Sequence, residues 1–273
     1  MDKKLLVTVD VEQDISKYLS NSFLGITEGM PFLLDLFKEV GILGTFFTQG
    51  LICDIFPEVI EEIKKRGHST GCHGYYHVPY GERTRWDTRR DVSIAIEAIR
   101  RVSGEKPVMF RAVEFSLTRR LVRVLEDHCF LIDSSALNNY RTSSLWGLTR
   151  KRVQNIKEEP YFLLKGRRPN KQTSILEVPV TENPRLLGTP IGAGFLNSRG
   201  VEATKAAMTD VRASYCTFLI HPWEVVDFPA EIRNLPAWVR RISKRGGEAL
   251  TDLLGWAVDN MASTDFQALT NLD

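Results

Sequence analysis

Short runs of apolar residues alternate along the chain with longer segments of helical spacing. The apolar runs predict strands at 4–9, 43–48, 69–72, 107–111, 130–133, 175–179 and 216–220. Between them, residues 30–40, 57–66, 87–102 and 118–127 carry apolar positions three or four apart, as amphipathic helices do. Strands that alternate with helices predict a parallel sheet or barrel.

Two parts of the chain depart from this alternation. Residues 140–171 lose the pattern and contain the cationic stretches 150–152 and 165–168, which form either a solvated loop or a basic lip that attracts an anionic substrate. Residues 230–273 predict a C-terminal helical extension. Within it, the basic segment 238–245 forms either a solvated helix face or a contact with anionic lipid. With no repeat or linker, we expect a single domain over 1–273.

Composition adds little that is specific. The chain has 273 residues, 43% of them apolar, and a net charge of +2, which gives no indication of a nucleic-acid partner. No apolar run reaches the roughly 18 residues that a membrane-spanning helix needs. Four scattered cysteines indicate free thiols. Because Met1 is followed almost at once by a strand, we expect a cytoplasmic protein that is at most peripheral at a membrane. The oligomeric state does not follow from these data.

Polar residues with useful chemistry fall at the ends of the predicted strands. The carboxyl ends of parallel strands converge on one face of a barrel, where active sites are built. Scattered surface residues would show no such bias. The residues at these positions are Asp10, Glu12, His73, His77, Arg111, Asp133 and His221.

The spacing of four of these side chains suggests a metal site. Asp10 and Glu12 are two apart on a strand and point to the same side, and His73 and His77 are four apart. Two imidazoles and one carboxylate leave coordination positions open, as in a catalytic metal site. Zinc, cobalt, nickel and iron all suit such ligands. The pattern points to metal-assisted hydrolysis.

Five motifs in order give the chain a family resemblance. They are Thr8–Glu12, His73–His77, Phe110–Arg111, Asp133–Ser135 and Leu219–Pro222. Over residues 4–225 the sequence resembles the NodB-homology polysaccharide deacetylases, carbohydrate esterase family 4. The resemblance implies an α/β fold, a distorted (β/α) barrel with about seven parallel strands.

The resemblance also implies roles for individual residues. Asp10 corresponds to the catalytic base and Arg111 to the cation that holds it ionised. His221 corresponds to the general acid, oriented by Asp133.

Metal and substrate contacts follow from the same resemblance. Since Val11 cannot ligate, Glu12 would join His73 and His77 as the third ligand of a divalent metal, most readily zinc. Leu219 would line the pocket for the acyl methyl group, and Phe115 would contact the substrate.

The arginine motif departs from what the family leads us to expect. The arginine motif reads Arg111 to Phe115 without the usual prolines, which changes the backbone that would hold an oxyanion. We expect Trp223 and Glu224, which follow the last motif, to lie at the rim.

The function expected from these features is hydrolysis of an N-acyl amide. The resemblance favours deacetylation of an N-acetylated sugar, glycan or lipid-linked sugar. The same centre would serve a deformylase of a lipid-linked formamido sugar or a cyclic-amide hydrolase. A carbohydrate-binding relative without catalysis is the alternative from another class.

Overall fold

The structure, a computed structural model, describes residues 3–15, 18–19, 21–140, 156–164, 172–230, 232, 235–243 and 247–270. Most of the predicted insertion at 140–171, with its cationic stretches, lies outside the described residues. No described helix is long and apolar enough to pass through a bilayer.

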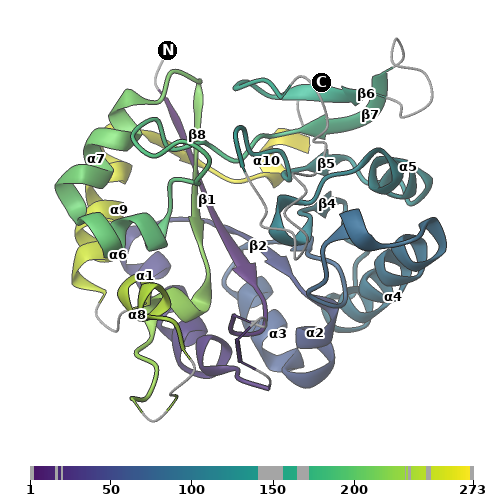
Figure 1. Cartoon of the computed structure of the whole chain (residues 1–273), viewed down its shortest axis with the longest axis horizontal. Helices are drawn as coiled ribbons and strands as arrows, with labels where there is room; N and C mark the ends of the chain where they lie inside the picture. The colour runs from purple at the N-terminus through teal and green to yellow at the C-terminus, as the bar shows by residue number, and fades with distance from the viewer. Residues whose placement is uncertain are drawn as a thin grey trace.

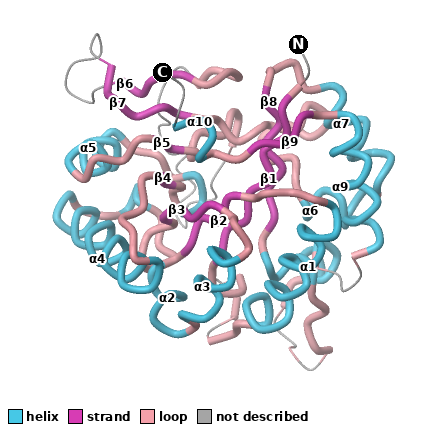
Figure 2. The backbone as a smooth tube through the Cα atoms, turned by 180° about the vertical axis from the view of Figure 1, so that it is seen from behind, coloured by secondary structure: helices cyan, strands magenta, loops and turns pink. Residues whose placement is uncertain are grey.

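A single curled sheet forms the centre of the molecule, with helices around its outer side (Figures 1 and 2). Its strands run in the order β6-β7-β5-β4-β3-β2-β1-β8, and β9 pairs with the start of β1. All pairs are parallel except β6 with β7. The strands are β1 (Lys4–Val11), β2 (Thr45–Thr48), β3 (Ser69–Cys72), β4 (Met109–Phe110), β5 (Ile132–Asp133), β6 (Tyr161–Leu164), β7 (Gln172–Glu177), β8 (Tyr215–Ile220) and β9 (Ala262–Thr264).

This arrangement is the expected distorted (β/α) barrel. All seven predicted strands are present, and β6 and β9 are additions that the sequence pattern did not predict. The described part of the chain shows no pairing of β6 with β8, so the sheet is a half-barrel. Residues 178–192 cross the gap: the Leu219 N–H donates to the carbonyl of Ile191.

Helices cover the outer face of the sheet. The four predicted helices appear within two residues of their expected bounds, as α1 (Met30–Val40), α3 (Pro57–Lys65), α4 (Arg85–Ser103) and α5 (Arg119–Asp127). Gly41 ends α1 in the left-handed conformation that favours glycine, with φ of 71°. The remaining helices are α2 (Gly50–Ile55), α6 (Ala193–Arg199), α7 (Val201–Asp210), α8 (Ala237–Ile242), α9 (Glu248–Asn260) and α10 (Gln267–Thr270).

Alternation along β1 decides which side chains lie on the inner face of the curled sheet. Leu5, Val7 and Val9 belong to the large core between the sheet and its helices. Leu6 belongs to a smaller core on the inner side, covered by the C-terminal residues Phe266 and Leu269. Because strand side chains alternate, the even-numbered residues, including the two carboxylates of the first motif, also face inward.

Candidate functional site

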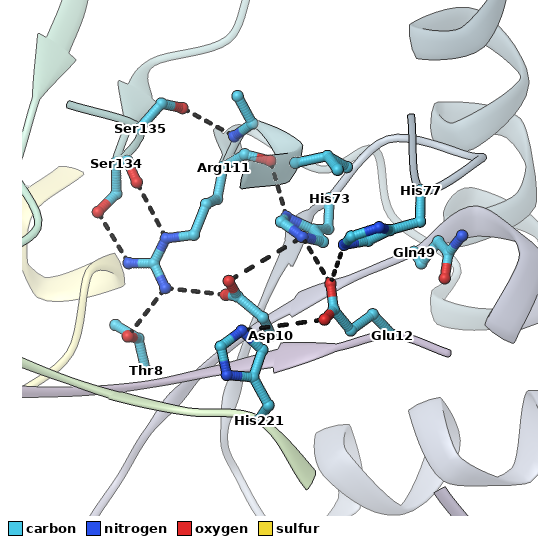
Figure 3. A network of polar contacts seen from close by, with 12 residues as sticks. Thr8, Asp10, Glu12, Gln49, His73, His77, Arg111, Ser134, Ser135 and His221 are labelled. Carbon is cyan, nitrogen blue, oxygen red and sulfur yellow. Dashed lines mark hydrogen bonds and ion pairs between the residues drawn. The ribbon is translucent and has the colours of Figure 1, made fainter. Parts of the chain in front are cut away.

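Three side chains from two strands, which lie on either side of β2, meet at the carboxyl edge of the sheet (Figure 3). Glu12 follows β1, and His73 and His77 follow β3. The Nε2 atoms of His73 and His77 lie 3.2 Å and 2.8 Å from the same Glu12 oxygen. One ligand atom from each residue lies within 4.8 Å of the others. The predicted trio therefore converges on one point.

The chemistry of these donors fits a divalent metal. The Nδ1 of His73 lies 2.9 Å from the carbonyl of Arg111 and donates to it, which leaves Nε2 free to ligate. Burial raises the pKa of Glu12, but the charge of His77 and the close contacts with both imidazoles outweigh it, so the pKa lies well below its usual value. An ionised carboxylate between two imidazoles is a ligand set for zinc and similar ions.

The loop that carries His77 is held by one buried carboxylate on α4. Asp91 is 2% exposed and accepts the backbone N–H groups of Tyr75 and Tyr76 and the hydroxyl of Tyr80. Arg83 adds an ion pair of 2.7 Å. Asp91 thus fixes the chain on both sides of His77.

Asp10 lies beside the trio with one oxygen held and one exposed to the site. Its Oδ1 accepts from Arg111 Nη1 at 2.9 Å, and its Oδ2 lies 4.0 Å from His73 Nε2. Arg111 is fully buried and also donates to Thr8 and to Ser134. The predicted pairing of Arg111 with Asp10 is present.

His221, at the end of β8, completes the centre from the other side. Its Nε2 lies 3.9 Å from Glu12, and its Nδ1 lies 3.3 Å from the carboxylate of Glu224. Burial lowers the pKa of His221, but Glu224 and then Glu12 raise it, with a net value of about 9. The ring of Trp223 stacks on the imidazole at 5.0 Å between centroids. At neutral pH the imidazole therefore carries a proton.

These contacts correct two predictions. Trp223 and Glu224 are 7% and 5% exposed, so they are buried beside His221 rather than placed at a rim. Asp133 was expected to orient His221, but among the described residues the carboxylate in ion-pair contact with its Nδ1 is that of Glu224. The reason is local: the tight turn after His221 returns Glu224 to its own backbone N–H, which donates to it at 2.8 Å.

Asp133 instead forms a buried pair with Glu177. Both side chains are fully buried, Asp133 accepts from Ser135, and Glu177 accepts from the N–H of Ala136. Burial and then the Asp133 charge raise the pKa of Glu177 well above its usual value. The pair lies beside the segment whose Ser134 accepts hydrogen bonds from Arg111. Asp133 therefore acts on the site indirectly, through the segment that binds Arg111.

The two predicted substrate contacts differ in position. Leu219 is buried in β8 at 2% exposure. Phe115 and its neighbour Glu114 have positive φ angles of 50° and 49°, an uncommon conformation for residues with side chains. Glu114 is close enough to add to the raised pKa of His77. The altered arginine motif thus has two consecutive residues in the left-handed conformation, and the charge of Glu114 acts on His77.

Sequence reasoning missed three carboxylates that support the site: Asp91, Glu177 and Glu224. Asp91 and Glu177 sit on elements whose pattern marks them only as buried positions. For Glu224 the signal was available, because a residue three positions after His221 can return to it across one turn.

The polysaccharide deacetylase family model matches residues 2–130, a span that holds the aspartate, histidine and arginine motifs of the site just described. Over this part of the chain, the predicted resemblance to the NodB-homology polysaccharide deacetylases is confirmed. Over 130 residues it is 29% identical to a peptidoglycan deacetylase from Helicobacter pylori. That alignment covers 48% of this chain and 43% of the relative, so the match spans less than half of the relative's length.

Solved structures of this deacetylase family share the fold across the whole chain. A Mycobacterium smegmatis protein described as a polysaccharide deacetylase is 20% identical, has a TM-score of 0.64 and covers 98% of this chain and 90% of its own. A pseudoenzyme of carbohydrate esterase family 4 from Bacillus anthracis is 11% identical, has a TM-score of 0.58, and covers 99% of this chain and 66% of its own. At such identities the likeness establishes the fold and leaves the activity to the site.

Proposed function

We propose that this protein is a metal-dependent deacetylase that hydrolyses the acetamide of an N-acetylated sugar in a glycan or glycan precursor. The observation that carries the proposal is the placement of Asp10 and His221 beside the trio of Glu12, His73 and His77. A base, an acid and three metal donors within one small space are the groups that amide hydrolysis needs.

Glu12, His73 and His77 would hold the metal, with zinc the first candidate. When bound, such an ion polarises the acyl carbonyl and lowers the pKa of water. The hydrogen bond from His73 Nδ1 to the Arg111 carbonyl fixes the ring that would ligate through Nε2.

Asp10 and His221 would move the protons. Arg111 holds Asp10 Oδ1, so that Oδ2 is the atom that takes a proton from the attacking water. On the other side, the protonated Nε2 of His221 delivers a proton to the leaving nitrogen as the C–N bond breaks. Glu224 stabilises this imidazolium through Nδ1. Leu219 and Phe115 remain the proposed contacts for the acyl group and the sugar.

Two substitutions in the first motif test these roles. We expect Asp10→Asn to keep the metal and to lose about 100-fold or more in kcat, because the base is gone. Glu12→Gln should bind metal weakly, since one anionic ligand is lost. Metal content by elemental analysis and acetate release from an N-acetylglucosamine oligosaccharide are the two measurements.

The substrate panel also separates the alternatives. It includes an N-formylated sugar and a cyclic amide beside the acetylated one. Preferential release of formate would identify a deformylase, and preferential ring opening would identify a cyclic-amide hydrolase. Full metal occupancy in the unaltered protein without release from any substrate would favour a carbohydrate-binding role. A pseudoenzyme with this fold is known.

A further inference from the structure

A second pocket lies on the same edge of the sheet as the metal centre. It has a volume of about 350 Å³ and lies where α4 and α5 begin, two helices that run side by side (Figures 1 and 2). Helices that follow parallel strands begin at the edge where active sites are built. The lining residues are Gly81, Arg85, Thr118, Arg119, Arg120 and Arg123.

The first turns of α5 carry three arginines at the end of the helix where positive charge is least favourable. Arg119, Arg120 and Arg123 all lie there, and the first turn contains no acidic residue. The amino end of a helix is itself positive, so cations at this end destabilise it. Arg119 and Arg123 are also four apart, a spacing at which like charges repel. An anion in the pocket would relieve both effects.

The protein neutralises only part of this charge. Arg85 lies 3.8 Å from Asp127, and Arg120 donates to the carbonyl of Arg83. Across the described ranges, no carboxylate is within ion-pair distance of Arg119 or Arg123. The Nε of Arg123 is buried and has no hydrogen-bond acceptor among these residues. A buried guanidinium N–H without an acceptor indicates a partner that comes from outside.

The loop that carries His77 also lines this pocket. Gly81 follows His77 by four residues, and the N–H of Tyr80 donates to Ser116 Oγ, which ties this loop to the one that leads into α5. A substrate that extends along this loop would meet both the metal centre and the arginines.

We propose that this pocket binds an oxyanion, carboxylate or phosphate, carried by the substrate, so that the preferred substrate is an anionic acetylated glycan. Guanidinium groups match both oxyanions with paired N–H donors. This inference rests on the proposed deacetylation.

The kinetic test compares a neutral with an anionic substrate. A neutral N-acetylglucosamine oligosaccharide is set against an N-acetylated muropeptide, which carries carboxylates, and against N-acetylglucosamine 1-phosphate. In Arg119→Ala/Arg123→Ala, we expect KM for at least one anionic substrate to rise about tenfold, the loss of one strong charge-assisted contact. Turnover of the neutral oligosaccharide should stay unchanged, because neither arginine touches the metal centre.

The matched control is Arg100→Ala/Arg199→Ala, which removes two exposed arginines outside the pocket and changes the net charge equally. Equal losses for the neutral and the anionic substrates, or the same loss in the control, would overturn the proposal. So would an unchanged KM for all of them.

A binding measurement tests the anion site without relying on turnover. Inorganic phosphate titrated into the metal-loaded protein should bind more weakly to the Arg119→Ala/Arg123→Ala variant than to the control variant. Equal isotherms would reject the anion site even if deacetylation is established. A difference between the isotherms would support the site even if no acetyl group is released.

Discussion

At the scale of single residues, the acid of the proposed reaction has a different partner from the one that the sequence suggests. His221 lies against Glu224, three positions further along the chain, while Asp133 is bound to Ser135 and Glu177. An opposite charge at 3.3 Å stabilises the imidazolium, which is why the pKa of His221 rises to about 9 although burial lowers it. Glu224 is thus a positioning residue for the proton donor.

Glu224→Gln tests this assignment. The glutamine keeps the shape and can still accept a hydrogen bond, but it removes the charge that raises the pKa of His221. Because a lower pKa means that the acid loses its proton at a lower pH, the alkaline limb of kcat/KM should move to lower pH. We expect kcat to fall about tenfold. The pH profile of acetate release is the measurement.

The comparison variant is Asp133→Asn, which alters the partner predicted from sequence. If Asp133→Asn moved the alkaline limb and Glu224→Gln left it in place, the assignment of Glu224 would be wrong.

At the scale of elements, the metal ligands depend on a loop that α4 holds in place. Gly74, directly after His73, has φ of 74°, and a Cβ there would lie 2.4 Å from the Tyr80 hydroxyl. That hydroxyl donates to Asp91, so the sharp turn and the carboxylate belong to one packed arrangement. β3 supplies His73, but α4 determines where His77 lies.

We therefore expect Asp91→Asn to weaken metal binding without changing any ligand. Asparagine lacks the negative charge that pairs with Arg83 and accepts fewer N–H groups. The loop that carries His77 would therefore be held less firmly. The loss of a supporting group typically lowers metal affinity about tenfold to 100-fold. The dissociation constant, measured by chelator competition, decides the question.

Asp87→Asn serves as the control on the same helix. Asp87 caps the start of α4 through Thr84, remote from the loop hydrogen bonds that Asp91 makes. If both variants lowered metal affinity equally, the effect would come from the helix as a whole and the role of Asp91 would be refuted.

At the scale of the whole molecule, the buried Asp133–Glu177 pair makes stability depend on pH. It joins β5 to β7 beneath the site. Since the pKa of Glu177 is well above normal in the folded state, the folded protein keeps a proton that the unfolded chain releases. This contribution is fully present below the unfolded pKa of about 4.3 and is lost as the pH rises toward the folded value.

Glu177→Gln should remove this part of the pH dependence. The amide imitates the protonated acid and has nothing to ionise. The free energy of unfolding of the unaltered protein should fall more steeply above pH 5 than that of the variant, by up to about 1.4 kcal/mol per pH unit. Denaturant unfolding at several pH values measures both slopes. Glu39→Gln, an exposed change on α1, is the control, and parallel curves for Glu177→Gln and the unaltered protein would exclude the explanation.

The sequence by itself determined seven strands of the sheet, four of its covering helices and the residues that meet at the centre. Alternation along β1 already put Asp10 and Glu12 on one side, and the parallel topology already brought His73, His77, Arg111 and His221 to one edge. These properties follow from local periodicity and from the geometry of parallel strands, which a pattern of apolar residues records.

Only the tertiary structure decided which side chains contact one another around the centre. The hold of Asp91 on the loop of His77 and the placement of Asp133 beside Glu177 depend on packing between separate elements of the fold. The same holds for the arginine pocket, which exists because α4 and α5 begin side by side. Such contacts are set by distances of a few ångström that no periodicity in the sequence encodes.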